Sequence, residues 1–393
     1  MTRRNADVVV IGGAVMGSST ACQLAQRADF TGKIIVLEPD SGYQHSASAR
    51  SAASIRQQFS TAINIEVSLF GIEYLRSIGE HLAVDGESPV IDLKEGGYLF
   101  LATPDKQDIL RENHALQSQL GANIAFHDTA GLSANFPWLR VDDLAAGCHG
   151  VTGEGWFDGY ALVQAFRKKA RALGVDYLAQ RAIGLERTGQ DWTVQLDNGD
   201  TLTAPVLVNT AGASGGADIC RAVGLEVPVH SRKRCVFTFE CRTQLDHFPL
   251  LIDPNGTYVR PEGAGYICGS APPEDHDPDS RDFEVDHWLF EDHIWPTLAN
   301  RVPAFEAIKP GAAWAGHYDM NLFDHNAFVG GVSGLDGFYL ALGFSGHGLQ
   351  QAPAIGRGLS ELIATGSYQT LDLGPLGIDR FFGNKPLKER NVV

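Results

Sequence analysis

The stretch DVVVIGGAVMG, residues 7–17, decides the fold class of this chain. An apolar run at Asp7–Ile11 predicts a buried strand, and the glycines that follow it predict a sharp turn. A helix is expected from about Ser18 to Ala28, and a second apolar run at Lys33–Leu37 predicts the next strand. Strand, glycine turn, helix and strand in this order form the first unit of a Rossmann-like α/β domain.

The glycines of this turn follow the G-x-G-x-x-G pattern of dinucleotide sites, with one change. Gly12 makes the tight turn and Gly17 lets the helix pack closely on the strand, but Ala14 replaces the second glycine. Glu38 ends the second strand at the spacing of the acid that binds ribose hydroxyls, and its charge disfavours a 2′-phosphate. We predict a dinucleotide site here, with an ordinary structural turn as the alternative. Its residues would be Gly12, Gly13, Ala14, Val15, Met16, Gly17 and Glu38.

A second glycine turn, GFSGHG at 343–348, lies between an apolar strand (338–342) and an apolar-periodic helix. A helix N-terminus carries unpaired N–H groups and about half a unit of positive charge. Such an end stabilises an anion, and a reduced flavin is an anion delocalised over N1 and C2=O. The turn therefore indicates a flavin contact, with an ordinary strand-to-helix turn as the alternative. Contacts are expected at Gly343, Ser345, Gly346, His347, Gly348, Leu349 and Gln350.

The length and composition describe a globular protein with more than one core. For 393 residues, two domains or one elaborate α/β domain are expected. The net charge of −16 disfavours nucleic acid or an anionic membrane surface as partner. No apolar run approaches the roughly 18 residues of a membrane span, and the start is interpreted as a strand rather than a secretory signal. Six scattered cysteines indicate free thiols, so we expect no metal site and a cytoplasmic location.

The pattern of elements changes along the chain. A hairpin is expected around Asn198-Gly199 and a strand at 206–212, and the stretch from about 220 to 320 is rich in β-strands. Further helices are expected at about 61–82, 106–120, 161–173 and 287–303. We therefore predict an α/β fold with an α+β insertion. The nucleotide-binding domain would comprise 1–85, 145–217 and 325–393, and a β-rich substrate domain would comprise 86–144 and 218–324.

Five segments together resemble one family of flavoproteins. They are DVVVIGGAVMGSSTACQLA, VLE, SASARSAASIRQQFS, VLVNTAGA and LALGFSGHGLQQAPAIGRGLSELIATG. In this order they resemble the D-amino-acid oxidase and sarcosine oxidase family. Arg56–Ser60, WAGHYDMNLFDHN (314–326) and the stretch DRFFGNKPLKERNVV are similar to a subgroup that contains a mitochondrial flavoprotein of respiratory complex I assembly. The resemblance implies FAD rather than NAD, because an NAD-dependent dehydrogenase would leave the turn at 343–348 unexplained.

The resemblance also implies which residues hold FAD. The acid at Glu38 would bind the adenosine half, and the turn at 343–348 would meet the flavin pyrimidine. Non-covalent FAD is expected, because Ser51 and the region of His317 stand where relatives carry covalent attachment residues. Further cofactor contacts are expected at Ser46, Ser48, Arg50, Ser51, Ala52, Ile183, Ala211 and Gly212.

Members of this family oxidise C–N bonds of amino acids or N-methyl amines by hydride transfer to flavin N5, after which the imine is hydrolysed. Arg56 falls where relatives bind the substrate carboxylate, with a structural ion pair or a surface arginine as the alternatives. Gln350 replaces a second carboxylate-binding lysine, which disfavours a simple sarcosine-like substrate. Ile267 replaces a lysine that promotes reaction with oxygen, which favours an unidentified electron acceptor other than O2.

Several other residues are candidates for the substrate site. Tyr258 and Arg260 are candidates because related amino-acid dehydrogenases place a substrate tyrosine in this strand, although packing or a solvated surface position is the commoner role of such residues. His317 and Tyr318, in AGHYD, and His347, at the entry to the helix after the second turn, are further candidates, with a hydrogen-bonded structural role as the alternative. The three basic residues at 232–234 are expected to be solvated at the end of a strand. The alternative is that they form a positively charged surface that attracts carboxylates toward the site. The competing function is a flavin-bearing assembly protein in which FAD is structural. A cavity with a cation beside the flavin favours the enzyme, whereas an occluded flavin and a large exposed apolar patch favour the scaffold.

Overall fold

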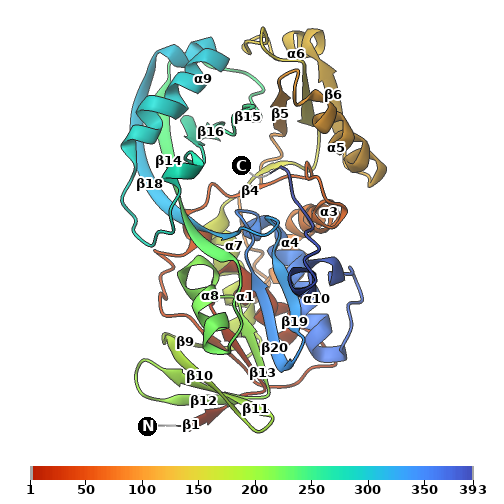
Figure 1. Cartoon of the computed structure of the whole chain (residues 1–393), viewed down its shortest axis with the longest axis vertical. Coiled ribbons are helices and arrows are strands. Elements are labelled where there is room, and N and C mark those ends of the chain that lie inside the picture. The colour runs from red at the N-terminus through yellow and green to blue at the C-terminus, as the bar shows by residue number, and fades with distance from the viewer. Residues whose placement is uncertain (1–2, 392–393) are drawn as a thin grey trace.

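The computed structural model describes residues 3–391, and its two parts meet near the middle of the molecule (Figure 1). The lower part is built on a six-stranded sheet in the order β19-β20-β13-β2-β3-β9. Its strands are β2 (Val8–Ile11), β3 (Ile34–Leu37), β9 (Asp176–Leu178), β13 (Val206–Asn209), β19 (Phe328–Val332) and β20 (Leu335–Leu342). Neighbouring strands are parallel, except that β19 pairs antiparallel with β20. The predicted α/β class with a Rossmann-like part is confirmed.

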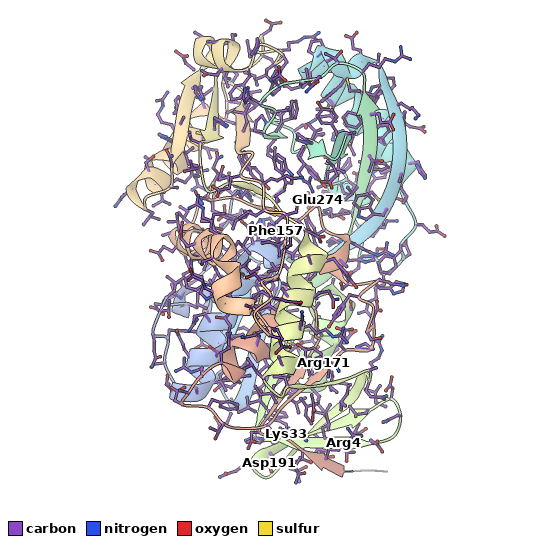
Figure 2. All side chains as sticks on the ribbon, turned by 180° about the vertical axis from the view of Figure 1, so that it is seen from behind. Arg4, Lys33, Phe157, Arg171, Asp191 and Glu274 are labelled. Atoms are coloured by element: carbon purple, nitrogen blue, oxygen red, sulfur yellow. The ribbon has the colours of Figure 1, made fainter. Side chains whose placement is uncertain are left out.

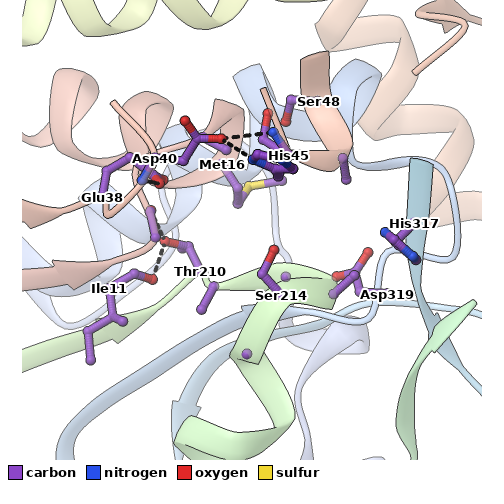
Figure 3. A pocket seen from close by; sticks show the side chains of 18 of the residues that line it. Ile11, Met16, Glu38, Asp40, His45, Ser48, Thr210, Ser214, His317 and Asp319 are labelled. Atoms are coloured by element: carbon purple, nitrogen blue, oxygen red, sulfur yellow. Dashed lines mark hydrogen bonds and ion pairs between the residues drawn. The ribbon is translucent and has the colours of Figure 1, made fainter. Parts of the chain in front are cut away.

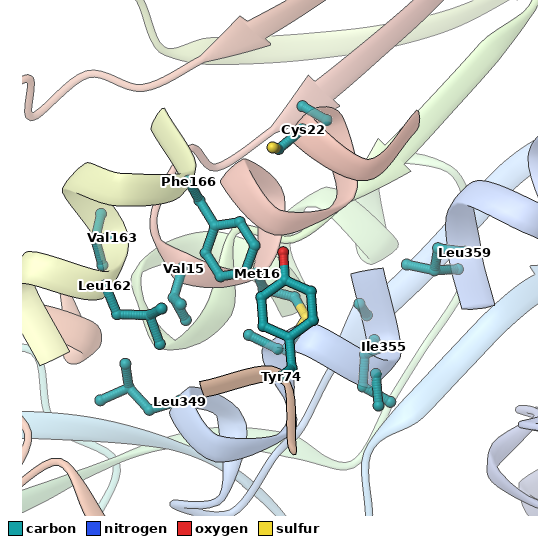
Figure 4. Packing of buried hydrophobic residues seen from close by; sticks show 14 of the residues in the cluster. Val15, Met16, Cys22, Tyr74, Leu162, Val163, Phe166, Leu349, Ile355 and Leu359 are labelled. Carbon is teal, nitrogen blue, oxygen red and sulfur yellow. The ribbon is translucent and has the colours of Figure 1, made fainter. Parts of the chain in front are cut away.

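Both faces of the six-stranded sheet are buried, because its central strands are apolar at every position. In β2, Val8 and Val10 lie on one face and Val9 and Ile11 on the other, and all four are buried. Four helices cover the first face, and their side chains meet around Phe166 (Figure 4). They are α1 (Val15–Ala25), α3 (Ala62–Arg76), α7 (Gly159–Ala172) and α10 (Gly348–Thr365).

The second face is covered by α8 (Gly212–Ala222) and by a small sheet in the order β1-β12-β11-β10. Its strands are β1 (Arg3–Asn5), β10 (Ala182–Thr188), β11 (Asp191–Leu196) and β12 (Thr201–Ala204). The predicted hairpin at Asn198-Gly199 is confirmed, since β11 and β12 pair antiparallel and Gly199 has a φ of +86°. Asp191 marks the far end of this lower part, and Phe157 lies close to the junction with the upper part (Figure 2).

The upper part is an eight-stranded sheet in the order β18-β14-β17-β16-β15-β5-β7-β6. Its strands are β5 (Tyr98–Ala102), β6 (Ile124–Asp128), β7 (Ala146–Gly150), β14 (Val229–Cys241), β15 (Leu250–Ile252), β16 (Tyr258–Glu262), β17 (Gly265–Gly269) and β18 (Ile308–Asn321). The long ribbon of β14 and β18 pairs from Val229 opposite Asn321 to Cys241 opposite Ile308. Its lower end reaches the turn between β20 and α10, where the Gly343 amide donates to Asp319 at 2.7 Å.

Several predicted boundaries are corrected by the structure. The helix expected at 61–82 is interrupted at Ser77, the strand expected at 206–212 ends at Asn209, and α1 begins at Val15 rather than near Ser18. The helix expected at 287–303 is a π-helical turn followed by a short α9, with Pro296 in its first turn. The remaining elements are α2 (Ala47–Arg50), α4 (Ile78–Leu82), α5 (Gln107–Gln119), α6 (Thr129–Asn135), α9 (Trp295–Arg301), α11 (Asp379–Phe382), β4 (Ser54–Ile55) and β8 (Gly155–Trp156).

The sheets divide the chain differently from the predicted segments at one place. Strand β7 belongs to the eight-stranded sheet, although the sequence assigned residues from 145 onward to the nucleotide-binding domain. The six cysteines are free thiols, and five of them are buried. Within residues 3–391 no helix is long and apolar enough to cross a membrane.

Candidate flavin and substrate site

A cavity of about 650 Å³ opens where the parallel strands of the lower sheet end. Ile11 closes β2, Leu37 closes β3 and Thr210 follows β13, so the cavity lies at the carboxyl edge of the sheet, the usual ligand position in open α/β folds. Figure 3 shows Glu38 and Asp40 on one side of it and His317 and Asp319 on another. Its volume falls within the range of small-molecule and cofactor sites.

The first glycine turn is shaped by close backbone contacts. Gly12 has a φ of +97°, and a Cβ there would lie 2.5 Å from the carbonyl oxygen of Thr210. A Cβ at Gly17 would lie 1.9 Å from the carbonyl oxygen of Gly12. Glu38 accepts from the Gly13 amide at 2.9 Å with Oε2 and from the Asp40 amide at 2.9 Å with Oε1, and burial raises the pKa of its carboxyl. Ala14, which replaces the second glycine of the pattern, also lines the cavity.

Three helix N-termini converge on this cavity without side-chain caps. Their N-cap residues, Ala14 of α1, Ala211 of α8 and His347 of α10, make no capping hydrogen bond. The cavity is lined beside them by the first residues of each helix. Uncapped helix N-termini offer free N–H groups and positive partial charge. The arrangement suits an extended anionic dinucleotide.

The second glycine turn is held by Asp319 at the end of β18. Asp319 Oδ2 accepts from the Gly343 amide at 2.7 Å, and its main-chain oxygen accepts from the Ser345 amide at 3.0 Å. Burial raises the pKa of the Asp319 carboxyl to about 6. Gly346 has a φ of +91°, and a Cβ there would lie 2.4 Å from the ring of Tyr318. Sequence reasoning singled out His317 and Tyr318 but missed Asp319, although it is the next residue in the same motif.

A second, smaller cavity of about 50 Å³ continues the larger one beneath the eight-stranded sheet. The two cavities share four lining residues, Ser51, Tyr318, Gly346 and Leu349. The smaller cavity is also lined by Ala52, Ala53, Ser54, Arg56, Tyr98, Leu250, Ile252, Tyr258, His347 and Gln350. The second glycine turn therefore separates a large cofactor-sized space from a small space lined by a cation and aromatic rings.

Arg56 is the cation of the smaller cavity, and its side chain is 3 % exposed. Its Nη1 donates to the carbonyl of Gln58 at 2.5 Å, and its Nη2 contacts His347 Nε2 at 3.2 Å and the carbonyl of Asn391. The guanidinium lies 4.1 Å from the ring centroid of Phe59. Burial lowers the pKa of Arg56, against the opposing charges of the nearby Glu389 and Glu154 carboxylates, and neither of these carboxylates lies within ion-pair distance of it.

Glu154 is a buried carboxylate beside this arginine that sequence reasoning missed. Its Oε1 accepts from the amides of Gln57 at 2.6 Å and Gln58 at 3.1 Å, and its Oε2 accepts from Gln58 Nε2 at 2.8 Å. Burial raises the pKa of Glu154 to about 7. Because it binds the two residues after Arg56, Glu154 fixes the backbone from which that side chain extends. No local motif marks it, since its partners are almost 100 positions earlier in the chain.

Two further side chains complete the surroundings of Arg56. An arginine N–H can only donate, so the contact with His347 requires Nε2 as acceptor and places the proton of a neutral imidazole on Nδ1. Burial, followed by the charge of Arg56, holds the pKa of His347 well below its usual value. Gln350 Oε1 accepts from the Arg56 amide at 2.9 Å and from Ser68 Oγ at 3.3 Å. Gln350 thus supports the main chain of Arg56 rather than adding a second cation.

Three tyrosines line the smaller cavity. The Tyr98 hydroxyl donates to Ser54 Oγ at 2.5 Å, whereas no hydrogen bond among residues 3–391 involves the hydroxyls of Tyr258 or Tyr318. Burial raises the pKa of all three, so each is a neutral phenol. The sequence did not indicate Tyr98 as a site residue, because the apolar pattern around it predicts only a buried strand.

The expected site residues that do not line the smaller cavity alone fall into two groups. Those lining the larger cavity are Gly12, Ala14, Val15, Met16, Glu38, Ser46, Ser48, Ser51, Ile183, Ala211, Gly212, His317, Tyr318, Gly346, Gly348 and Leu349. Those lining neither cavity are Gly13, Gly17, Arg50, Arg260, Gly343 and Ser345. Of these, Gly13 and Gly17 shape the first turn and Gly343 and Ser345 the second. Arg50 donates to the carbonyls of Gln44 and Ala315.

Two expectations are corrected by these contacts. Arg260 was a candidate substrate ligand, but its guanidinium is taken by Glu262 and by the Ala52 carbonyl at 2.6 Å. The basic trio at 232–234 was expected to be solvated or to attract carboxylates. Instead Lys233 pairs with Asp282 at 3.1 Å, and Arg234 pairs with Asp277 at 2.8 Å. These cations are neutralised by the acidic loop that follows β17.

Comparisons with known proteins agree with this geometry. The family model described as FAD dependent oxidoreductase, DAO, matches residues 7–362. FAD-dependent oxidoreductase domain-containing protein 1 of Xenopus laevis is 39 % identical over 424 residues, covering 99 % of this chain and 85 % of that protein. L-proline dehydrogenase from P. horikoshii has a similar structure, with a TM-score of 0.86, 23 % identity and coverage of 98 % and 100 % of the two chains. Glycine oxidase from Geobacillus kaustophilus matches with a TM-score of 0.81, 20 % identity and coverage of 95 % and 98 %.

Proposed function

The chain belongs to the DAO family of FAD-dependent oxidoreductases, and from that premise we propose that it oxidises the C–N bond of an amino acid, or of a secondary amine that carries a carboxylate. We propose further that the electrons leave to an acceptor other than oxygen. The residues of the larger cavity fit FAD, since Glu38 would hold the ribose hydroxyls and three uncapped helix N-termini suit the diphosphate and an anionic ring. Two structural neighbours have names that denote action on amino acids, proline and glycine.

The observation that carries the proposal is the state of Arg56. Three arginines are buried in the described part of the chain, and two have carboxylate partners: Arg301 pairs with Asp253 at 2.7 Å, and Arg260 pairs with Glu262. Arg56 has only neutral hydrogen-bond acceptors and lines a cavity. Because a buried charge is costly unless it is paired, the cavity beside Arg56 suits an anionic group of the ligand. A carboxylate is the anion that a guanidinium binds through two parallel hydrogen bonds.

The other side chains of the smaller cavity support oxidation next to that carboxylate. FAD, when bound, supplies the acceptor for a hydride from the carbon that bears the amine. Arg56 would hold the carboxylate, and the Tyr258 and Tyr318 hydroxyls would be free to hydrogen-bond the amine, because no described residue uses them. Apolar side chains of Leu250 and Ile252 exclude water from the same space.

The proposal of an acceptor other than oxygen rests on Ile267. This buried side chain lies in β17 opposite Arg260, on the sheet face that also carries Tyr258. No lysine occupies the strand, and the charge of the neighbouring Arg260 is balanced by Glu262. Among the described residues, the sheet face around Ile267 therefore has no unpaired cation of its own that would stabilise superoxide, the first product of electron transfer to oxygen. Arg56, the cation of the smaller cavity, would instead be neutralised by the substrate carboxylate.

Anaerobic mixing of the FAD-loaded protein with a panel of amino acids and N-alkyl amino acids tests the function. A substrate should bleach the flavin absorbance, and reoxidation by air should be slow compared with reoxidation by an artificial electron acceptor. Arg56→Ala should then raise KM by roughly 10²-fold, the effect of losing about 3 kcal/mol of charge-assisted hydrogen bonding. Glu186→Ala, an exposed change on β10, is the control. If no compound reduces the flavin, the alternative of a flavin-bearing assembly protein replaces the enzyme.

A further inference from the structure

The C-terminal segment reaches the arginine of the smaller cavity. The main-chain oxygen of Asn391 accepts a hydrogen bond from Arg56 Nη2. The Asn391 side chain donates through Nδ2 to the Gln58 carbonyl at 3.0 Å and accepts from Asn113 Nδ2 at 3.3 Å. Residue 391 is thus attached both to the guanidinium and to the segment that carries it.

The segment is anchored two residues earlier by Glu389, which is 1 % exposed. Its Oε1 accepts from the Ser60 amide at 2.8 Å and from Ser60 Oγ at 2.6 Å, and its Oε2 accepts from Thr61 Oγ1 at 2.9 Å and from Asn64 Nδ2 at 3.0 Å. These bonds to a buried carboxylate are charge-assisted and hold Glu389 in place. The Asn391 amide also donates to Glu389 Oε1 at 3.0 Å, whereas its side-chain partners, Gln58 and Asn113, are neutral. Four hydrogen bonds hold the Glu389 side chain to residues 60–64, so Glu389 is the fixed point from which residue 391 extends.

The hydrogen bond from Arg56 Nη2 to the Asn391 carbonyl occupies a nitrogen that a bound carboxylate needs. A carboxylate receives two parallel hydrogen bonds either from Nε with Nη2 or from Nη1 with Nη2, so both edges use Nη2. The two N–H groups of Nη2 are matched by two acceptors, His347 Nε2 and the Asn391 carbonyl. A bidentate carboxylate therefore requires one of them to leave. His347 is held by α10 and packs edge-to-face on Phe59 at 5.0 Å, whereas Asn391 lies outside any helix or strand.

Resting on the proposed function, we propose that the segment from Glu389 to Asn391 is an internal competitor of the substrate. In the free protein the Asn391 carbonyl occupies the hydrogen-bonding position of the substrate carboxylate on Arg56. The substrate displaces it, because an anion bonds more strongly to the buried cation than a neutral carbonyl does. The segment pivots at Glu389. Only molecules in which residue 391 is undocked can bind a carboxylate, so the apparent Kd equals the intrinsic Kd divided by the undocked fraction.

Limited trypsin digestion of the FAD-loaded protein measures this displacement directly. Acetate is the probe, since the smaller cavity is only about 50 Å³. Saturating acetate should raise the rate of cleavage after Arg390 at least about threefold relative to potassium chloride of equal ionic strength, because a docked segment resists the protease. Cleavage after Arg242, in an exposed turn that lines neither cavity, should not change. In Arg56→Ala the cut after Arg390 should be fast without acetate and unresponsive to it.

A titration of the flavin absorbance with acetate gives the second measurement. Asn391→Ala removes both side-chain bonds of residue 391 and should lower the Kd of acetate about threefold to tenfold. Arg390→Ala is the matched control, because that side chain reaches only Glu112 at 3.6 Å, and the Kd should be unchanged.

The possible failures are distinguishable. If acetate binds in an Arg56-dependent way but leaves both the cut after Arg390 and the Kd of Asn391→Ala unchanged, the competitor is refuted and the proposed function stands. If acetate changes neither the spectrum nor the cut, the carboxylate site is refuted and the competitor with it.

Discussion

Single atoms decide the shape of both glycine turns. A Cβ at Gly17 would collide with the Gly12 carbonyl, and one at Gly346 would collide with the Tyr318 ring. The first collision can be anticipated from sequence, because the G-x-G-x-x-G pattern describes a local strand-to-helix packing. The second depends on how β18 approaches the β20–α10 turn, which no local pattern describes.

Gly17→Ala should separate α1 from β2 and weaken FAD binding. We expect a loss of stability of about 1–3 kcal/mol, the usual cost of overpacking, and a lower FAD content after desalting. Gly42→Ala is the control, because a Cβ there would have its nearest neighbours at 3.7 Å. Absorbance of bound flavin and thermal unfolding would measure both effects. Full FAD occupancy in Gly17→Ala would contradict the close approach of strand and helix.

Glu154 should make the stability of the protein depend on pH. Its pKa is raised from 4.5 to about 7 in the folded state, so the folded protein holds the proton more tightly than the unfolded chain. Stability should therefore fall as the pH rises from about 4.5 to about 7, by an amount of the order of 3 kcal/mol for this group. Glu154→Gln should flatten the dependence in urea unfolding measured across this range.

The control for that experiment is Glu186→Gln, an exposed substitution that should leave the pH dependence as it is in the wild type. A variant Glu154→Gln whose stability falls as steeply as that of the wild type would show that other groups, such as Asp319 with its pKa raised to about 6, account for the slope.

The candidate site shows which kinds of residue a sequence can reveal. Arg56 and Glu38 lie in or beside recognisable motifs, and both line a cavity. Glu154 and Asp319 act by accepting main-chain hydrogen bonds from distant segments, so their roles exist only in the folded chain. Gln350 was read as a substituted cation, whereas its oxygen supports the Arg56 main chain.

Helices and strands were predictable where their signals are local. Helix α7 begins after Asp158, which accepts from the Ala161 amide at 2.9 Å as a helix N-cap, and a glycine follows its end. The break at Ser77 between α3 and α4 carries neither glycine nor proline, so the apolar period continues through it. The short helix α2 was missed for the opposite reason, since its small residues have no apolar period.

Asp158→Ala tests the capping of α7. Losing the N-cap bond should lower the free energy of unfolding by about 1 kcal/mol, measured by urea unfolding of the FAD-loaded protein. Asp142→Ala, an exposed carboxylate in a turn, should change it by less than about 0.5 kcal/mol. Equal effects from both substitutions would show that charge, not capping, is responsible.

The molecule as a whole is organised around the junction of its two sheets. The larger cavity takes residues from β2 and β3, from the end of β18 and from the start of α10, so a bound dinucleotide contacts both parts. The division into two parts follows from a change of composition along the chain. The assignment of β7 to the upper sheet does not, because it is decided by pairing with β5 and β6.

FAD should stabilise the folded protein strongly, and FMN should not replace it. At 100 to 1,000 times its Kd, FAD would add about 3–4 kcal/mol to the free energy of unfolding. FMN lacks the adenosine half that Glu38 and the first glycine turn would hold. Thermal unfolding of the apoprotein with each cofactor gives the comparison. An equal rise in Tm with FMN would contradict the assignment of Glu38 and the first glycine turn to the adenosine half of FAD.

The order of strands in the lower sheet also bears on how the protein is made. Strand β13 lies between β2, which a ribosome completes early, and β20, more than 300 residues later. At a translation rate of about 5–20 residues per second, β2 waits roughly 15 to 65 s for the last parallel strand. From the time that β13 (Val206–Asn209) is made until β20 emerges, β13 is an open sheet edge, and the turn that follows β20 does not yet exist. Because the cavity includes the start of α10, we expect cofactor loading to follow the synthesis of β20 and α10 and so to be a late event in biosynthesis.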